Sequence, residues 1–531
     1  MAKILITGTL HPSAIEALRS LPEAIVLNKP ECSKEELYSL VEDVDVLVTR
    51  SETAVDADLF AKAKQLRIVA RAAVGVANID LAEATRRGIL VLNTPGQNTN
   101  SAAELTLGLL LSMFRKIPEA HQHVLDGEWE RHRFLGHELK DKTIGIVGLG
   151  NVGHRVALFA HGFEMRVVGY DPYISDQRFK KYDVEPCRSL KELCERVDVL
   201  TVHTPLNSET RGLIDRSLLQ MMKPQGWVLN VARGGIIDED ALLSCLQEEH
   251  IAAAGIDTWV GEPEISKDLV EHPRVYKTPH IGATTVQAQK AIADEVVKQI
   301  GKALNGSVVD SPVNFPLSLE DENPLNASYA VLAEKLARFI GQVLDFQPNR
   351  MILQRQGALA QDDGQLIKLG WMKGYAHHKV DGYVSYVNAE DCFQRLGVSL
   401  QSESPLSTRN YHTKGDLWVI VENDHSEALM IGGTVYDGQH MRLTDLNGFQ
   451  FDVNPQGCFL VIENEDKPGV IGQIGTVLGR CGMNIDSFDL SRKTVGGDAM
   501  ALIRVDEFRK DALDKLAALP HIRKVRQVSI D

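Results

Sequence analysis

The 531-residue chain lacks several features that would assign it to a membrane, a secreted or a nucleic-acid-binding class. Its seven cysteines are scattered and odd in number, with no CxxC pair, which argues against a disulfide framework or a zinc site. No apolar run is long enough to span a membrane. The net charge of −15 comes without a concentrated basic face, which argues against nucleic acid as a partner. The start, MAKILITG, has no signal-peptide layout, so we expect a cytoplasmic protein. Because the cysteine pattern gives no zinc site, we expect no metal ion.

The length exceeds what one hydrophobic core can hold, so several domains are expected. Short apolar runs alternate with helical stretches over roughly the first 310 residues, which predicts two doubly wound parallel-sheet domains of the α/β class. An acidic stretch with three prolines, 311–324, is interpreted as a linker, and two α+β domains should follow it. The predicted domains are 1–97 with 286–308 (one discontinuous domain), 98–285, 309–455 (linker and third domain) and 456–531.

The most informative stretch is 142–171, in which a buried strand runs into Gly148-Leu-Gly-Asn-Val-Gly153 and a second strand ends at Asp171. The first glycine permits a tight turn, the second lets backbone approach a pyrophosphate, and the third lets helix and strand pack closely. The Asp171 carboxylate can accept hydrogen bonds from both ribose hydroxyls and would repel a 2′-phosphate, which predicts NAD rather than NADP. The cofactor residues expected here are Gly148, Gly150, Asn151, Val152, Gly153 and Asp171.

Three later strand ends carry side chains suited to the oxidation of a secondary alcohol. The imidazole of His280 can take the hydroxyl proton while hydride leaves to NAD. Glu262 would orient that ring and stabilise the imidazolium, and the planar fork of Arg233 would bind a substrate carboxylate. The other residues at these strand ends that are expected to contact the cofactor are Thr204, Pro205, Ala232 and Gly282, together with Arg233 and His280 themselves.

Over roughly residues 1–310 these motifs resemble the D-isomer-specific 2-hydroxyacid dehydrogenase family. The resemblance rests on the glycine fingerprint with Asp171, on Asn230-Val-Ala-Arg-Gly-Gly235, on Asp257 to Pro263 and on Pro279-His-Ile-Gly282. It implies the catalytic roles given above and adds Asp257 as a ligand of the nicotinamide amide. One departure is Val74, where many relatives carry threonine near the cofactor, so a hydroxyl contact is lost there.

The region after residue 310 resembles the long-form branch of the same family, in which an intervening domain and an ACT domain follow the dehydrogenase half. The order of elements from 457 to the end, βαββαβ, is ferredoxin-like. The branch implies oxidation of D-3-phosphoglycerate to 3-phosphohydroxypyruvate, the first step of phosphorylated L-serine biosynthesis. Relatives carry arginines that imply Arg50, and Arg131 of a neighbouring subunit, as phosphate ligands. The expected substrate residues are Arg50, Ser51, Gly75, Asn98 and Arg131.

The ACT-like domain carries a predicted effector site for L-serine. Asp466 can accept hydrogen bonds from an ammonium group, while Asn464 and Asn484 offer both donors and acceptors. The alternative is that these residues only cap a helix and close a dimer. A mostly apolar helix at 101–114, with an expected capping box from Ser101 to Glu104, predicts a homo-oligomer, either a dimer through the cofactor domains or a tetramer.

Two other functions stay open at this point. A glyoxylate or hydroxypyruvate reductase of the same family is the first, although the extension of roughly 220 residues argues against it. The second is a non-enzymatic, NAD-sensing corepressor on the same fold, which could retain the catalytic residues. The ACT-like tail and the lack of a basic or disordered interaction segment favour the enzyme.

Overall fold

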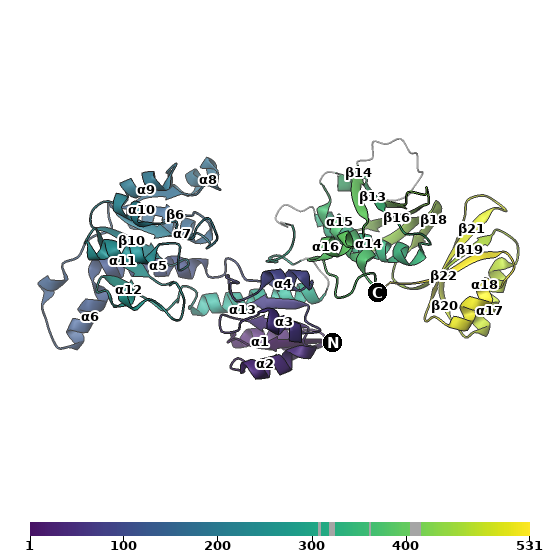
Figure 1. Ribbon diagram of the computed structural model, residues 1–531, viewed down its shortest axis with the longest axis horizontal. Helices are drawn as coiled ribbons and strands as arrows, with labels where there is room; N and C mark the ends of the chain where they lie inside the picture. Colours follow the sequence, from purple (N-terminus) through teal and green to yellow (C-terminus); the bar gives the residue numbers. More distant parts are fainter. Residues whose placement is uncertain (306–308, 318–323, 361–362, 404–415, 531) are drawn as a thin grey trace.

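Four sheets follow one another along the chain in the computed structural model, which describes residues 1–305, 309–317, 324–360, 363–403 and 416–530 (Figure 1). Two of the sheets are parallel, as the alternation of strands and helices predicts, so the α/β assignment of the first half is confirmed. Among the described residues, no helix is both long and apolar enough to cross a bilayer.

The first sheet has the order β2-β1-β3-β4-β5, and its five strands are all parallel. Buried residues of α13, such as Ile292 and Val296, share a core with Ile4 of β1, so the chain returns to this sheet after the second one. The elements are β1 (Ala2–Ile6), α1 (Pro12–Arg19), β2 (Ala24–Asn28), α2 (Lys34–Leu40), β3 (Val46–Thr49), α3 (Ala57–Lys62), β4 (Ile68–Arg71), α4 (Leu81–Arg86), β5 (Leu90–Leu92) and α13 (Val286–Leu304).

The second sheet has the order β12-β11-β10-β9-β6-β7-β8. The chain adds β7 and β8 on one side of β6 and then β9 to β12 on its other side, so the strand order reverses between β6 and β9, although these strands are parallel. Ligands of doubly wound sheets bind at the carboxyl ends of the strands at such a reversal. The strands are β6 (Thr143–Val147), β7 (Arg166–Tyr170), β8 (Glu185–Pro186), β9 (Val199–Val202), β10 (Gly226–Asn230), β11 (Ile251–Ile256) and β12 (Val275–Lys277). The helices are α5 (Thr99–Arg115), α6 (Ile117–Leu125), α7 (Asn151–Gly162), α8 (Asp176–Lys181), α9 (Leu190–Arg196), α10 (Arg216–Met221), α11 (Glu239–Gln247) and α12 (Lys267–Glu271).

Two details of helix α5 differ from the prediction. The helix begins at Thr99 rather than after a capping box, and Ser101 Oγ instead lies 2.8 Å from Thr285 Oγ1. Its apolar side chains, including Leu110 and Phe114, are buried in the core of the second sheet. The apolar face of α5 is therefore satisfied within one chain and gives no argument for a partner subunit.

The predicted linker also begins later than expected. Val309 is buried against the first sheet, and Pro312 to Asn314 lie along the edge strand β5. Val313 N donates to Val91 O (2.8 Å), and Val91 N donates to Asn314 Oδ1 (2.9 Å). This segment therefore shields the edge of the first sheet. Part of the rest of the predicted linker lies outside the described residues.

The third sheet, of order β14-β13-β15-β16-β17-β18, packs against two helices that approach each other closely. A Cβ added at Gly370 or Gly374 of α15 would lie 2.2 or 2.1 Å from a backbone oxygen of α14, so glycine is required there. The elements are α14 (Pro324–Val343), β13 (Arg350–Arg355), α15 (Gln365–Ala376), α16 (Ala389–Gln394), β14 (Ser399–Glu403), β15 (Leu417–Glu422), β16 (Ala428–Tyr436), β17 (His440–Leu446) and β18 (Phe449–Val453).

The last sheet has the antiparallel order β20-β21-β19-β22, which is the ferredoxin-like order that the sequence predicts. One face of this sheet shares a core with α14, where Phe339 and Phe459 lie 6.0 Å apart between ring centroids. Helix α14 thus packs on the third and fourth sheets at once. The elements are β19 (Gly457–Glu465), α17 (Val470–Arg480), β20 (Ile485–Arg492), β21 (Asp498–Val505), α18 (Lys510–Ala517) and β22 (Ile522–Ile530).

Candidate active site

The glycine fingerprint has the geometry that a pyrophosphate requires. Gly148 has φ of +88°, and a Cβ there would lie 2.8 Å from His203 O. A Cβ on Gly153 would lie 1.9 Å from Gly148 O, whereas the position above Gly150 is open to 4 Å. The backbone is therefore tight where helix and strand meet and accessible where α7 begins.

A cavity of about 390 Å³ lies beside the fingerprint, at the carboxyl ends of β6, β7 and β9. Asp171 is fixed at its wall because its two carboxylate oxygens accept hydrogen bonds from Leu149 N (2.9 Å) and Tyr173 N (3.0 Å). Each oxygen keeps a further lone pair, so the carboxylate can still accept from a ribose diol. Thr204 and Pro205 line the same cavity, which therefore fits the adenosine part of the predicted NAD.

His203 is a wall residue of this cavity that the sequence analysis did not single out. Its Nε2 lies 2.9 Å from Thr201 Oγ1, and burial lowers the pKa of the imidazole to about 3. The ring is therefore neutral at physiological pH and acts as part of an uncharged wall. Its place at the end of a buried strand is the only sequence signal that could have indicated it.

The predicted catalytic pair is assembled. His280 Nδ1 lies 2.6 Å from Glu262 Oε2, and Trp259 N donates to Glu262 Oε1 (2.6 Å). Burial alone would raise the pKa of Glu262, but the hydrogen bonds from His280 and Trp259 hold it below its ordinary value. The carboxylate is therefore ionised at neutral pH and can orient the imidazole, leaving Nε2 to face a substrate.

Asp257 holds the loop that carries His280. It is fully buried, and its carboxylate accepts hydrogen bonds from Thr278 Oγ1 (2.6 Å), Ile281 N (2.8 Å) and Gly282 N (2.9 Å). The loop needs this support because His280 itself has a positive φ of 54°. The implied contact between Asp257 and the nicotinamide amide stays a prediction.

Three arginines come together at the cleft between the two parallel sheets. Arg71, at the end of β4, is only 6% exposed, and it donates to Gly75 O (3.0 Å) and Ser51 Oγ (3.2 Å). Arg233 reaches the same turn, since a Cβ on Gly75 would lie 3.0 Å from its Nη2. Arg50 donates to Thr9 O (2.9 Å) and Gln289 Oε1 (2.8 Å).

Carboxylates lie near this arginine cluster (Arg50, Arg71 and Arg233) without pairing with it: against the effect of burial, Glu52 raises the pKa of Arg71, and Glu262 raises that of Arg233. Among the described residues, none of the three forms an ion pair within 4.0 Å. Burial lowers the pKa of Arg71 to about 10; the charge of Arg50 lowers it further, Glu52 partly opposes this, and Arg233 makes a smaller contribution in the same direction as Arg50. Three clustered guanidinium groups without an ion-pair partner are suited to bind an anion. The sequence analysis did not single out Arg71.

Of the other predicted substrate residues, Ser51 and Gly75 accept hydrogen bonds from this cluster, whereas Asn98 and Arg131 form none with it among the described residues. Asn98 precedes α5 and makes no side-chain cap. Arg131 begins a short 3-10 helix (Arg131–Phe134) after α6, and α6 lies on the side of its domain away from the first sheet (Figure 1). Within one chain, Arg131 is therefore not part of the arginine cluster, in keeping with its predicted contribution from a neighbouring subunit.

The predicted effector residues lie at both ends of the fourth sheet. Asp466 Oδ2 accepts from Arg492 (3.0 Å) and from Gly496 N (2.9 Å). Asn464 is buried at the end of β19, and Asn484 precedes β20 and donates to Asp506 (3.2 Å). Because β19 and β20 run in the same direction on either side of β21, Asn464 and Asn484 cannot meet within one chain.

Comparison with known proteins agrees with this geometry. The family model described as the D-isomer specific 2-hydroxyacid dehydrogenase, NAD binding domain, matches residues 107–282, and that of the D-3-phosphoglycerate dehydrogenase intervening domain matches residues 327–447. D-3-phosphoglycerate dehydrogenase of Methanocaldococcus jannaschii is 37% identical over the full length of both chains. That of Bacillus subtilis is 36% identical over 92% of each chain. The TT0316 protein of Thermus thermophilus, 34% identical with a TM-score of 0.54, covers 59% of this chain and 99% of its own.

The fold, the fingerprint and the His280–Glu262 pair therefore define an NAD-dependent oxidoreductase of the D-isomer-specific 2-hydroxyacid dehydrogenase class. The similarity extends through the intervening domain to the end of the chain, which a dehydrogenase half alone does not explain. The chain belongs to the D-3-phosphoglycerate dehydrogenase family.

Proposed function

We propose that the chain oxidises D-3-phosphoglycerate to 3-phosphohydroxypyruvate and so supplies the first intermediate of phosphorylated L-serine biosynthesis. The observation that carries the proposal is the arginine cluster beside the His280–Glu262 pair. A substrate with both a carboxylate and a phosphate supplies the negative charge that this cluster lacks. The names of relatives that match along the whole chain support the same substrate.

In the proposed mechanism, Arg233 binds the substrate carboxylate and places C2 near His280. His280 takes the hydroxyl proton, and the ionised Glu262 stabilises the imidazolium that forms. Bound NAD supplies the acceptor for the C2 hydride. Arg71 and Arg50 hold the phosphate end, Ser51, Gly75 and Asn98 complete the substrate site, and Arg131 of a neighbouring subunit is proposed to close it.

The proposed cofactor contacts follow the fingerprint cavity. The glycine turn with Asn151 and Val152 binds the pyrophosphate, and Asp171 binds the adenosine ribose. The further residues proposed to contact NAD are Thr204, Pro205, Ala232, Asp257 and Gly282. We retain the division into 1–97 with 286–308, 98–285, 309–455 and 456–531, except that the contacts of Val309 to Asn314 support extending the first domain to about residue 315.

The experiment that tests the activity is NADH formation with a panel of 2-hydroxy acids. D-3-phosphoglycerate should exceed D-glycerate in kcat/KM by about 100-fold, because D-glycerate leaves the buried cations uncompensated. Glyoxylate and hydroxypyruvate, assayed with NADH in the reverse direction, test the reductase alternative. Equal turnover of phosphorylated and unphosphorylated acids would refute the proposed substrate.

We also propose a homo-oligomer, a dimer through the NAD domains that the tail domains extend to a tetramer. The support is the segment after α5, where Ile117, Leu125, Trp129 and Leu135 are 50%, 66%, 78% and 83% exposed. Exposed apolar side chains grouped in one arm are typical of a subunit interface. Sedimentation should show a dimer or larger, and Trp129→Ser should weaken it. An active monomer would contradict this proposal.

Feedback inhibition by L-serine at Asn464, Asp466 and Asn484 is a further part of the proposal. Asn464 and Asn484 lie at opposite ends of one sheet, so a shared ligand requires two chains, which would couple binding to quaternary structure. The seven unpaired cysteines favour a reducing compartment, and we propose the cytoplasm. Initial rates against L-serine test the regulation directly.

A further inference from the structure

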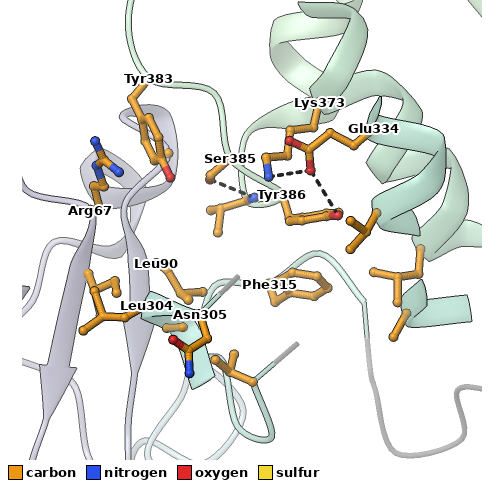
Figure 2. A pocket seen from close by; sticks show the side chains of 18 of the residues that line it. Arg67, Leu90, Leu304, Asn305, Phe315, Glu334, Lys373, Tyr383, Ser385 and Tyr386 are labelled. Carbon is orange, nitrogen blue, oxygen red and sulfur yellow. Dashed lines mark hydrogen bonds and ion pairs between the residues drawn. The ribbon is translucent and has the colours of Figure 1, made fainter. Parts of the chain in front are cut away.

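A second cavity, of about 620 Å³, lies between the first sheet and the intervening domain (Figure 2). Leu90, Phe315 and the exposed Arg67 line it from the side of the first sheet. Glu334 and Tyr386 line it from the side of the intervening domain. The cavity and the active site lie at opposite ends of β4, because Arg67 precedes this strand and Arg71, of the arginine cluster, ends it. Its size is within the range of small-molecule sites.

Cations outnumber carboxylates among the described residues of the wall. Glu334, 8% exposed, is its one acidic residue and is already engaged, with Oε1 2.6 Å from Arg338 and Oε2 2.7 Å from Lys373. Within the part of the chain that the structure describes, Arg67 and Lys335 have no carboxylate within 4.0 Å. Burial lowers the pKa of Lys335, which the charge of Glu334 partly opposes; its ammonium donates to an amide oxygen, Gln456 Oε1, at 3.4 Å.

Aromatic rings form much of the remaining wall. Phe315 and Tyr386, from the two sides of the cavity, lie 6.3 Å apart between ring centroids. Arg67 lies over the Tyr383 ring at 5.4 Å. A ligand that contacts both the aromatic and the cationic side chains of the cavity needs an apolar body and an anionic group. We propose that this cavity binds a small organic carboxylate, with its apolar body against the rings and its anionic group between Arg67 and Lys335.

Such a ligand would hold the dehydrogenase half against the tail. The direct contact between the two parts includes the close approach of Gly88, where a Cβ would lie 2.8 Å from Tyr383 O. Lys335 belongs to α14, which also packs on the fourth sheet. A carboxylate bridging Arg67 and Lys335 would therefore link β4 to the helix that supports the ACT-like domain. This inference does not depend on the identity of the catalytic substrate.

The test uses 4-phenylbutyrate as probe and its neutral isostere 4-phenylbutan-1-ol. Both are titrated calorimetrically into the full-length protein with NADH and D-3-phosphoglycerate present, a non-reacting pair that fills the active site. Phenylbutyrate should bind at least about tenfold more tightly than the alcohol, because only the anion pairs with the two cations. Arg67→Gln and Lys335→Gln should each weaken phenylbutyrate binding about five- to tenfold, without changing basal turnover.

Lys64→Gln and Lys298→Gln are the matched controls, because these lysines are exposed, pair with Glu42 and Asp310, and lie outside the cavity. Both should bind the probe as the unmodified protein does. Equal affinity for acid and alcohol, or unchanged affinity in both cavity variants, would overturn the proposal. So would loss of binding when NADH and D-3-phosphoglycerate are added, since the probe would then occupy the active site. Unchanged thermal unfolding confirms that each variant is folded.

Discussion

The catalytic cleft and the predicted effector loop differ in whether their charged side chains already have ion-pair partners. In the cleft, Arg71 is almost fully buried beside Arg50 and Arg233, and none of them has an ion-pair partner among the described residues. At the effector loop, Asp466 is already paired with Arg492 and hydrogen-bonded to Gly496 N, and its pKa is lowered by those contacts. The cleft is thus prepared for an anion, whereas an effector must compete with protein groups for Asp466.

The comparison teaches that unliganded sites differ in what a ligand must displace. In the cleft, an anion replaces water around cations whose burial is otherwise unfavourable. In the ACT-like domain, a ligand's ammonium group must replace Arg492 at Asp466. The free energy gained is therefore only the difference between the interactions of these two cations with the carboxylate. The cleft should therefore bind its ligand with large mutational effects, and the effector loop with small ones.

The largest effect is expected for His280→Ala, which removes the group that is proposed to take the proton. The value of kcat should fall about 10²- to 10⁴-fold, with NADH affinity nearly unchanged. Stopped-flow turnover and NADH fluorescence measure the two quantities. His440→Ala, an exposed histidine of β17, is the control. Retention of wild-type kcat would show that another group takes the proton.

Next in size is Arg71→Ala, which tests the cleft directly. The KM for D-3-phosphoglycerate should rise about 100-fold, whereas the KM for NAD should change little. Because the pKa of Arg71 is lowered to about 10, its charge is lost as pH rises through about 10, so substrate KM in the unmodified enzyme should rise there. Arg86→Ala, an exposed arginine of α4, is the control. Unchanged substrate KM would mean that the cluster is structural.

Glu262→Gln should lower kcat about ten- to 100-fold, because the charged hydrogen bond to His280 becomes a neutral one. The lowered pKa of Glu262 keeps it ionised down to acidic pH, so the unmodified enzyme has this stabilisation throughout the neutral range. The acid limb of the pH–rate profile for oxidation should move to lower pH in the variant. Glu264→Gln is the neighbouring control, and superimposable profiles would exclude a role for Glu262.

Asp171→Ala concerns the cofactor and should raise the KM for NAD about tenfold. Discrimination against NADP should relax, because the repelling carboxylate is gone. Kinetics with both cofactors measure the change, and Asp176→Ala, on the nearby α8, is the control. Equal use of NAD and NADP by the unmodified enzyme would contradict the role of Asp171.

The smallest effect is expected at the effector loop. Asp466→Asn should weaken inhibition by L-serine only a few-fold, because Arg492 loses its partner in the same variant and the net change is small. Inhibition curves measure the shift, with Asp511→Asn on α18 as the control. If Asp466→Asn weakened inhibition by L-serine about 100-fold, as much as Arg71→Ala is expected to raise the substrate KM, the proposed difference between the two sites would be wrong.

Local patterns predicted the catalytic half well because its elements and motifs are close in sequence. The strand after the glycine fingerprint ends beside Asp171 as predicted, and Glu262 lies against His280 as predicted. Arg71 was missed because its role depends on Arg50 and Arg233, which only the tertiary structure brings near it. The expected Ser101–Glu104 cap failed because Ser101 pairs with Thr285, a residue distant in the sequence.

The tail was harder to interpret because its packing crosses domain boundaries. The sequence correctly indicated that α+β structure follows the linker, but not that α14 would be covered by two different sheets. The predicted linker contains Val313, which pairs with β5, since proline and acidic residues do not exclude an edge contact. Such associations depend on partners that are hundreds of residues away.

The shared position of α14 determines where the chain can be shortened. A protein ending before β19 would retain α14 but lose Phe459 and the rest of the face that covers it, so its apolar side chains would promote aggregation. Ending the chain near residue 316 removes α14 together with both sheets that it supports and keeps Asn314 on the β5 edge. The intervening and ACT-like domains should therefore unfold as one cooperative unit. A protein truncated between them should aggregate more than one that lacks both.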